Sequence, residues 1–251
     1  SRGKQLDLAL RAIPRRTGVP VNVRNLGESR PHAVLWDMDG TLVNTEPHWM
    51  AGQRALATFH GVRWTEIDAL STVGKPMPVS AAMLQEKGIP LSIEQIIDDL
   101  LARVVKVLDG GIPWIPGAFK LLASVRDAGI PCALVTMAYK PVAFRVAAGA
   151  PEGAFQIVVA GDDVHRGKPD PEAYLTACIR LGVSPEDCVA VEDTLNGTLS
   201  AEAAGTHVLV IPSVAPVPAG HNRSRASALS GITLDDLRSI ASGRVIDTIV
   251  D

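Results

Sequence analysis

The feature that most limits the fold of this chain is a series of short apolar runs, each followed by polar residues. Between the runs lie segments whose apolar residues recur at helical spacing. Short apolar strands that alternate with helices predict βαβ units and a parallel sheet. We therefore predict an α/β protein with a Rossmann-like, doubly wound parallel sheet as its core. Ligands bind at the carboxyl edge of such sheets, so the polar residues after the runs are expected to meet in one site.

The predicted elements of this core follow one another in a regular order. Strands are predicted at residues 33–36, 131–135, 155–160, 188–191 and 206–211, and helices at 117–128, 141–148, 171–181, 195–204 and 234–240. Asp170 and Thr233 are predicted helix N-caps, and residues 212–230, rich in Pro, Ala and Ser, are predicted to be a loop. The polar residues expected at the carboxyl edge of the sheet are Asp37, Asp39, Thr136, Asp162, Asp163, Glu192 and Asp193, with Lys168 on a nearby loop.

Residues 45–112 show a different pattern, without any strand-like run. Helices are predicted there at 46–60, 65–72, 78–87 and 92–108, the last with Ser92 and Gln95 as a capping box. This stretch is predicted to be an all-helical domain, inserted into a core made of residues 32–44 and 113–251.

Residues 1–31 are predicted to be a separate basic leader. This segment contains seven basic residues but only two acidic ones, Asp7 and Glu28, and it lacks the long apolar stretch of a secretory signal. We predict a flexible extension or docking arm without a catalytic role, and a transit peptide is the alternative.

The composition narrows the class of partner. A net charge of −3 gives no basic surface for nucleic acid, and no stretch reaches the roughly 18 apolar residues of a membrane span. The three cysteines form no CxxC pair, which favours buried thiols and a cytoplasmic location. His60, His207 and His221 lack ligand spacing and are predicted to be structural or at the surface. We expect a monomer or homodimer that binds a small molecule.

The acidic residues at the predicted edge suggest phosphoryl transfer. Asp37 and Asp39 would share one face of a strand, where two carboxylates repel unless a cation lies between them or one is protonated. Mg²⁺ prefers oxygen ligands and combines one or two carboxylates with substrate phosphate. Lys168 adds a positive charge, and the Thr136 hydroxyl can donate to a phosphate oxygen. Each motif alone is also compatible with solvated turns or helix caps, so their co-occurrence carries the prediction.

Four segments resemble the motifs of the haloacid dehalogenase-like superfamily, in its phosphatase and phosphomutase branch. WDMDGTLVNTEPHW is similar to the first motif, LVTMA to the second, GKPDPEAY to the third and VEDTLNG to the fourth. They stand in the family's order between residues 33 and 211, and together they are highly specific.

The resemblance implies a role for each matched residue. Asp37 would attack phosphorus and form an aspartyl-phosphate, and Asp39 would act as general acid and then general base. Thr136 and Lys168 would hold the phosphoryl oxygens. The implied cofactor is Mg²⁺, with Asp37, Asp39 through its backbone carbonyl, Asp193 and, as a further candidate, Glu192 as ligands.

The helical insert resembles the cap of this superfamily, which closes over the core site and selects substrate. The cap residues predicted to face the site are Glu46, His48, Trp49, Gly74 and Lys75. Lys75 is equally compatible with a solvated turn. The predicted substrate-binding residues are Glu46, Lys75, Thr136, Met137 and Lys168. Met137 departs from the family pattern, because Ser or Asn is usual after the hydroxyl residue.

Several reactions of the superfamily compete. Dehalogenation has no need for Asp39, because a halide leaves without a proton, and a phosphonate hydrolase would need a cap lysine, for which only Lys75 is available. Mutases of the β-phosphoglucomutase type usually carry a histidine twelve residues after the nucleophile, where this chain has Trp49. We therefore predict a magnesium-dependent phosphatase of a small phosphorylated metabolite, with a sugar or polyol phosphate favoured. The alternatives are a phosphomutase and a non-catalytic binding module with the same fold.

Overall fold

The computed structural model describes residues 31–249, and its core is a parallel six-stranded sheet in the order β3-β2-β1-β4-β5-β6. The strands are β1 (Ala33–Trp36), β2 (Cys132–Val135), β3 (Ile157–Val159), β4 (Cys188–Glu192), β5 (His207–Val210) and β6 (Arg223–Arg225). Each neighbouring pair is parallel, and the order reverses direction beside β1. This is the predicted doubly wound α/β core. The predicted leader lies outside the described residues, apart from residue 31.

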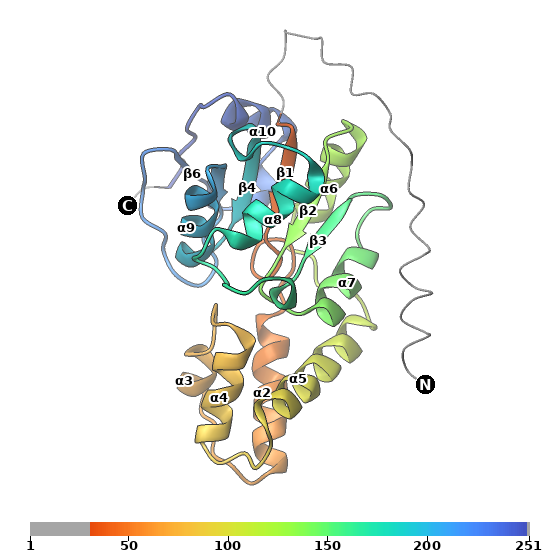
Figure 1. Cartoon of the computed structure of the whole chain (residues 1–251), viewed down its shortest axis with the longest axis vertical. Coiled ribbons are helices and arrows are strands. Elements are labelled where there is room, and N and C mark those ends of the chain that lie inside the picture. Colours follow the sequence, from red (N-terminus) through yellow and green to blue (C-terminus); the bar gives the residue numbers. More distant parts are fainter. Residues whose placement is uncertain (1–30, 250–251) are drawn as a thin grey trace.

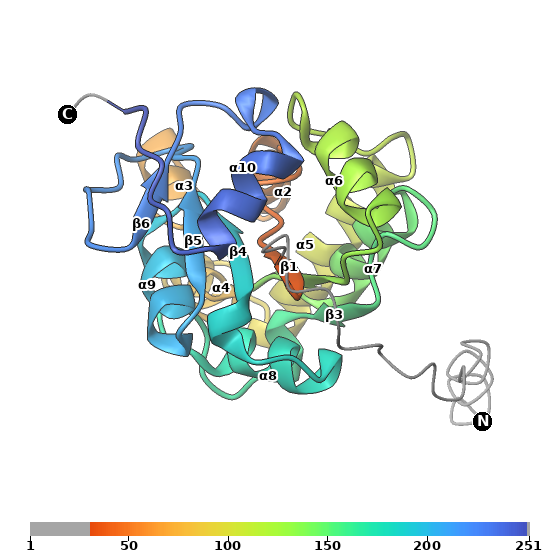
Figure 2. The same cartoon turned by 90° about the horizontal axis from the view of Figure 1, so that it is seen from above.

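Helices cover both faces of the sheet (Figures 1 and 2). They are α6 (Ala118–Asp127), α7 (Lys140–Ala148), α8 (Glu172–Leu181), α9 (Leu195–Ala204) and α10 (Leu234–Ala241). Val34 and Trp36 point into the cluster that contains apolar residues of α6, α7 and α10, whereas Ala33 and Leu35 point into the cluster of α8 and α9. Successive strand residues face opposite sides, so a fully apolar run suits a strand that is covered on both faces.

Four helices lie between β1 and α6 in the sequence and form a separate helical layer below the carboxyl edge of the sheet (Figure 1). They are α2 (Glu46–Phe59), α3 (Glu66–Leu70), α4 (Met77–Glu86) and α5 (Ile93–Leu108). We call them the helical insert. Ser92 and Gln95 form the predicted capping box of α5, and the buried residues of α5 follow the predicted apolar face. Where the chain leaves and re-enters the core, Asn44 N–H donates to Pro113 O at 2.9 Å and Ile115 N–H donates to Leu42 O at 2.8 Å.

Two local predictions need correction. The predicted loop at 212–230 contains β6, which pairs with β5 at the sheet edge. Its sequence, Arg-Ser-Arg, has no apolar run, and ion pairs of Arg223 with Glu202 and Arg225 with Asp247 replace apolar packing there. The N-cap of α8 is Pro171 and not Asp170 as predicted. The Asp170 carboxylate still accepts a hydrogen bond from Glu172 N–H at 3.0 Å. Thr233 caps α10 as predicted.

The sequence also led to predictions for the cysteines, for three histidines and for membrane-spanning helices. Cys132, Cys178 and Cys188 are free and buried, as expected. His60 and His207 are partly buried and His221 is exposed. Among the helices in residues 31–249, none is both long and apolar enough to cross a membrane.

Candidate active site

The candidate site lies where the carboxyl ends of the central strands meet. β1 is followed by Asp37, β2 by Thr136, and β4 ends in Glu192 and continues to Asp193. Because β1 pairs with both β2 and β4, these ends lie side by side at the point where the strand order changes direction. Parallel topology therefore collects residues that are up to about 150 positions apart in the chain, as the Thr41–Asp193 contact shows with a separation of 152.

The turn after β1 folds back on itself and depends on Gly40. The N–H groups of Leu42 and Val43 donate to Met38 O at 2.9 and 3.1 Å. Gly40 has φ +82°, and a Cβ there would lie 2.1 Å from Asp193 Oδ2. Both the backbone conformation and the space therefore require glycine. The turn also places the Thr41 hydroxyl 3.0 Å from Asp37 Oδ2 and 3.3 Å from Asp193 Oδ1, between two carboxylates.

Three of the predicted metal ligands form a compact acidic cluster. Asp37, Glu192 and Asp193 are buried, and each offers a carboxylate oxygen within 4.8 Å of the others. Burial and the charges of Asp37 and Glu192 raise the pKa of Asp193 well above its ordinary value. A donor set of carboxylate oxygens that repel one another fits a hard divalent cation such as Mg²⁺. The Asp39 side chain is not part of this cluster, which leaves its backbone carbonyl as the predicted donor.

Lys168 balances part of this negative charge. Its Nζ donates to Asp37 Oδ1 at 2.7 Å, to Glu192 Oε1 at 2.6 Å and to the carbonyl of Val135 at 3.0 Å, and its side chain is 6% exposed. Burial alone would lower the pKa of Lys168, but the charges of Asp37 and Glu192 outweigh it and raise that pKa above its ordinary value. Lys168 is therefore a fixed cation between the two carboxylates.

Glu192 is held from a second side by the last residue of the GKPDPEAY segment, to which the sequence analysis assigned no role. The Tyr174 hydroxyl, on α8, donates to Glu192 Oε1, and Tyr174 is completely buried. Burial raises the pKa of Glu192 to about 7, and the charge of Asp37 adds to this, while Lys168 opposes it. Burial also raises the pKa of Tyr174 well above its ordinary value, so its hydroxyl remains a donor.

Asp39 occupies a different environment from Asp37. One oxygen accepts from the Thr45 hydroxyl, and the other accepts from the Thr136 hydroxyl at 3.3 Å. Burial raises the pKa of Asp39 to about 6, with the charge of Asp37 acting in the same direction and the Thr45 hydrogen bond opposing it. A carboxyl group with a pKa near neutrality can both donate and accept a proton in the working range of an enzyme.

The loop after β2 is fixed by residues that follow β3. Gly161 N–H donates to Ala138 O at 2.8 Å, and a Cβ on Gly161 would lie 2.1 Å from the carbonyl oxygen of Met137. Asp162 accepts from Lys140 N–H at 3.0 Å, and Asp163 forms an ion pair with the Lys140 side chain at 2.9 Å. Asp162 and Asp163 therefore support the loop that carries Thr136; neither contacts Lys168.

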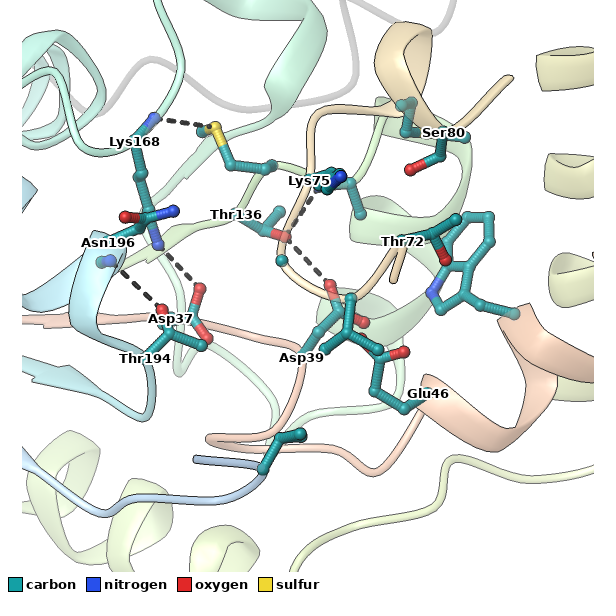
Figure 3. A pocket seen from close by; sticks show the side chains of 18 of the residues that line it. Asp37, Asp39, Glu46, Thr72, Lys75, Ser80, Thr136, Lys168, Thr194 and Asn196 are labelled. Carbon is teal, nitrogen blue, oxygen red and sulfur yellow. Dashed lines mark hydrogen bonds and ion pairs between the residues drawn. The ribbon is translucent and has the colours of Figure 1, made fainter. Parts of the chain in front are cut away.

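One cavity joins these core residues to the helical insert, and its volume is about 130 Å³. Figure 3 shows Asp37, Lys168, Thr194 and Asn196 at one end and Glu46, Thr72 and Ser80 at the other. The cavity reaches most of the predicted site residues. Those that line it are Asp37, Asp39, Glu46, Trp49, Gly74, Lys75, Thr136, Met137, Lys168 and Asp193.

Some lining residues escaped sequence reasoning, and two predicted ones do not line the cavity. Glu192 lies behind Lys168 and Tyr174, and His48 does not reach the cavity wall. The additional lining residues are Gln53, Thr72, Val73, Met77, Ser80, Leu100, Ala138, Thr194, Asn196, Gly197 and Val214. Gly197 and Asn196 fall inside the VEDTLNG segment and could have been found from it, but the insert residues carry no sequence signal of their own.

Comparison with known proteins identifies the family. The profile of the haloacid dehalogenase-like hydrolases matches residues 31–205. Hexitol phosphatase A of Escherichia coli is 35% identical over 73% of this chain and 84% of its own length. The bifunctional riboflavin kinase/FMN phosphatase of Arabidopsis thaliana is 30% identical over 72% of this chain, which spans only about half (48%) of that relative. This chain belongs to the haloacid dehalogenase-like hydrolase family.

A solved structure agrees with this assignment. The chain is similar to a variant of CbbY from Rhodobacter sphaeroides, crystallised in complex with xylulose-(1,5)bisphosphate, with a TM-score of 0.74 and 30% sequence identity over 82% of this chain and 99% of that one. The relatives named as phosphatases support a phosphatase activity for this chain.

Proposed function

We propose that this protein hydrolyses the phosphate monoester of a small metabolite, with Mg²⁺ as cofactor and an aspartyl-phosphate on Asp37 as intermediate. The observation that supports this most directly is the surroundings of Asp37. It is a nearly buried carboxylate, paired with Lys168, beside two further acids and close to a second aspartate that has its own hydrogen bonds. A carboxylate held this way is a nucleophile whose position is fixed before substrate arrives.

The roles follow from the contacts. Asp37 Oδ would attack phosphorus while Asp39, with its raised pKa, would give its proton to the departing alkoxide and later take one from the attacking water. The Thr136 hydroxyl, which contacts Asp39, and the Lys168 ammonium, which contacts Asp37, would hold phosphoryl oxygens. Bound Mg²⁺, held by Asp37, the Asp39 carbonyl, Asp193 and Glu192, would neutralise charge between the carboxylates and the phosphate.

We also propose that residues 45–112 act as a cap over a core of residues 32–44 and 113–251. The cavity is lined from both parts, so a substrate would be enclosed by the helical insert. The two chain segments that connect insert and core hydrogen-bond to each other at Asn44 and Pro113. Such a paired connection can bend as a unit, which is how a hinge positions a lid.

The substrate is proposed to be a sugar or polyol phosphate. A cavity volume of about 130 Å³ lies below the range of about 300–1,000 Å³ that is usual for drug-sized ligands. This favours a short carbon chain over a nucleotide or flavin. The names of hexitol phosphatase A and of the CbbY complex concern phosphorylated carbohydrates, and they support the same class here.

The test is phosphate release from a panel of sugar, polyol, nucleotide and glycolate phosphates, with Mg²⁺ and with chelator. Asp37→Asn should abolish release, whereas Asp98→Asn, at an exposed position of α5, should leave it unchanged. Intact-mass measurement during turnover should show a phosphorylated enzyme for the natural sequence and none for Asp37→Asn. Phosphorylation of Asp37→Asn would refute the nucleophile assignment. Isomerisation of a sugar phosphate without phosphate release would instead identify a mutase, and complete inactivity would favour a binding module.

A further inference from the structure

Resting on the proposed function, we propose that the end of the cavity in the helical insert selects monophosphates with a neutral, hydroxyl-bearing body and rejects bisphosphates, with Glu46 and Ser80 as the specificity-determining residues. Both residues would contact the part of the substrate that is not transferred. Glu46 contributes to the charge of the cavity lining, and Ser80 contributes a hydroxyl without a hydrogen-bond partner in the part of the chain that the structure describes.

The cavity is strongly acidic. Its charged lining residues are four carboxylates and two ammonium groups, namely Asp37, Asp39, Glu46 and Asp193 against Lys75 and Lys168. A divalent cation and Lys168 would offset the acids at the phosphoryl end. The Nζ of Lys168 contacts Asp37, Glu192 and the Val135 carbonyl, so its charge lies at the phosphoryl end of the cavity and not at the end in the insert.

The end of the cavity in the insert offers little to a second phosphate. Glu46 begins α2, is half-buried, and has no ion pair among the described residues. Among residues 31–249, the only cation that lines this end is Lys75, which is exposed, and its Nζ lies 3.8 Å from Met83 Sδ on α4. A second phosphate would therefore lie near the Glu46 carboxylate, which has no ion-pair partner in the described part of the chain. Repulsion between two negative groups that are shielded from water lowers the affinity for such a ligand.

Neutral hydroxyl groups would be received better. Ser80 of α4 lines the cavity and is 8% exposed, yet its hydroxyl has no hydrogen-bond partner in residues 31–249. The neighbouring polar groups are already paired: Gln53 Nε2 donates to Thr72 Oγ1 at 3.0 Å, and Trp64 Nε1 donates to Gln53 Oε1 at 3.3 Å. A hydroxyl that is accessible from the cavity and has no protein partner is suited to a hydroxyl group of the ligand.

The remaining wall of this end suits the carbon skeleton of a polyol. Trp49, Met77 and Leu100 line it with apolar surface. A lining with both polar and apolar groups suits a sugar or sugar alcohol, which carries both hydroxyl and C–H groups. The lining therefore describes a monophosphate with several hydroxyl groups and no second charge (Figure 3).

The experiment compares kcat/KM for matched pairs: sorbitol 6-phosphate with sorbitol 1,6-bisphosphate, and fructose 6-phosphate with fructose 1,6-bisphosphate, at pH 8 with Mg²⁺. At this pH, Glu46, whose pKa burial raises to about 7, is mostly ionised. The unmodified enzyme should favour each monophosphate by about tenfold or more. Glu46→Gln should reduce this preference to within about threefold, and its control Glu66→Gln, exposed on α3, should not.

Ser80 is tested with a polyol phosphate and its deoxygenated analogues. Ser80→Ala should lower kcat/KM for the fully hydroxylated substrate about two- to tenfold and remove the discrimination against one analogue. The exposed Ser71→Ala is the control. A preference for bisphosphates that Lys75→Met abolishes, and that its exposed control Lys106→Met retains, would overturn the proposal, as would unchanged ratios in Glu46→Gln. Absence of Mg²⁺-dependent and Asp37-dependent release from every compound, including p-nitrophenyl phosphate, would overturn the proposed function itself.

Discussion

The hydrogen bond from Tyr174 to Glu192 should make a measurable contribution to stability, and Tyr174→Phe tests it. The substitution removes one oxygen atom and leaves the ring, so it creates almost no cavity. The lost hydroxyl is fully buried, and its partner Glu192 also holds Lys168 at 2.6 Å. Hydrogen bonds to charged groups contribute about 1.5–3 kcal/mol, and the abandoned acceptor has no water to replace the donor. We therefore expect Tyr174→Phe to lower the free energy of unfolding by about 2 kcal/mol.

The chain offers a matched control for this measurement. Tyr139 is its only other tyrosine and lies half-buried, and its hydroxyl makes no hydrogen bond within the described residues. Urea unfolding of the metal-free protein at pH 8 gives both free energies, provided that the denaturant slopes agree. Tyr139→Phe should change the free energy of unfolding by less than about 0.5 kcal/mol. Equal losses for the two variants would refute the reasoning, because the Tyr174 hydroxyl would then contribute nothing beyond an ordinary tyrosine.

Three further outcomes follow from the site. Gly197→Ala should destabilise the protein by about 1–3 kcal/mol and impair activity, because the new Cβ would lie 2.0 Å from Glu192 Oε2; Gly231→Ala, with nothing within 4 Å, is the control in the same unfolding assay. Burial raises the folded-state pKa of Glu46 from its usual 4.5 to about 7, with the charge of Asp39 adding to this, so its neutral form stabilises the fold below about pH 4.5 and this contribution is lost as the pH rises through 7. Between pH 4.5 and pH 8, the free energy of unfolding of the unmodified protein should therefore fall by on the order of 3 kcal/mol more than that of Glu46→Gln. Parallel curves for the two proteins would contradict this. Mg²⁺ at a hundred times its dissociation constant should stabilise the folded protein by about 2.7 kcal/mol and so raise its melting temperature. Asp193→Asn should reduce that rise in melting temperature. A rise of the same size in Asp193→Asn would exclude Asp193 as a ligand.

Much of the fold follows from local patterns. The run Ala33–Trp36 becomes β1 with the predicted bounds, and α9 spans the predicted residues Leu195–Ala204. Apolar runs and helix caps are formed by a few neighbouring residues, so they can be recognised without knowing how the rest of the chain packs. β6 was missed for the same reason: Arg223–Arg225 has a polar sequence, and only pairing with β5 and ion pairs to distant acids make it a strand.

The site divides in the same way. The residues of the four motifs carry their chemistry in their spacing, and the parallel sheet brings Asp37, Thr136 and Asp193 to one edge as predicted. The contacts of these residues carry no comparable signal. Tyr174 ends the GKPDPEAY segment, but its hydrogen bond to Glu192 depends on how α8 packs against β1, β2 and β3.

By itself, then, the sequence determined the alternation of strands and helices, the helical insert and the acids that end the strands, because each depends on residues close together in the chain. The tertiary structure decided which charges are paired, which groups are desolvated and which side chains of the insert face the acids. These properties depend on distances between segments far apart in sequence and on the exclusion of water. Two results of that packing are Lys168 between Asp37 and Glu192, and a Ser80 hydroxyl that lines the cavity without a hydrogen-bond partner in residues 31–249.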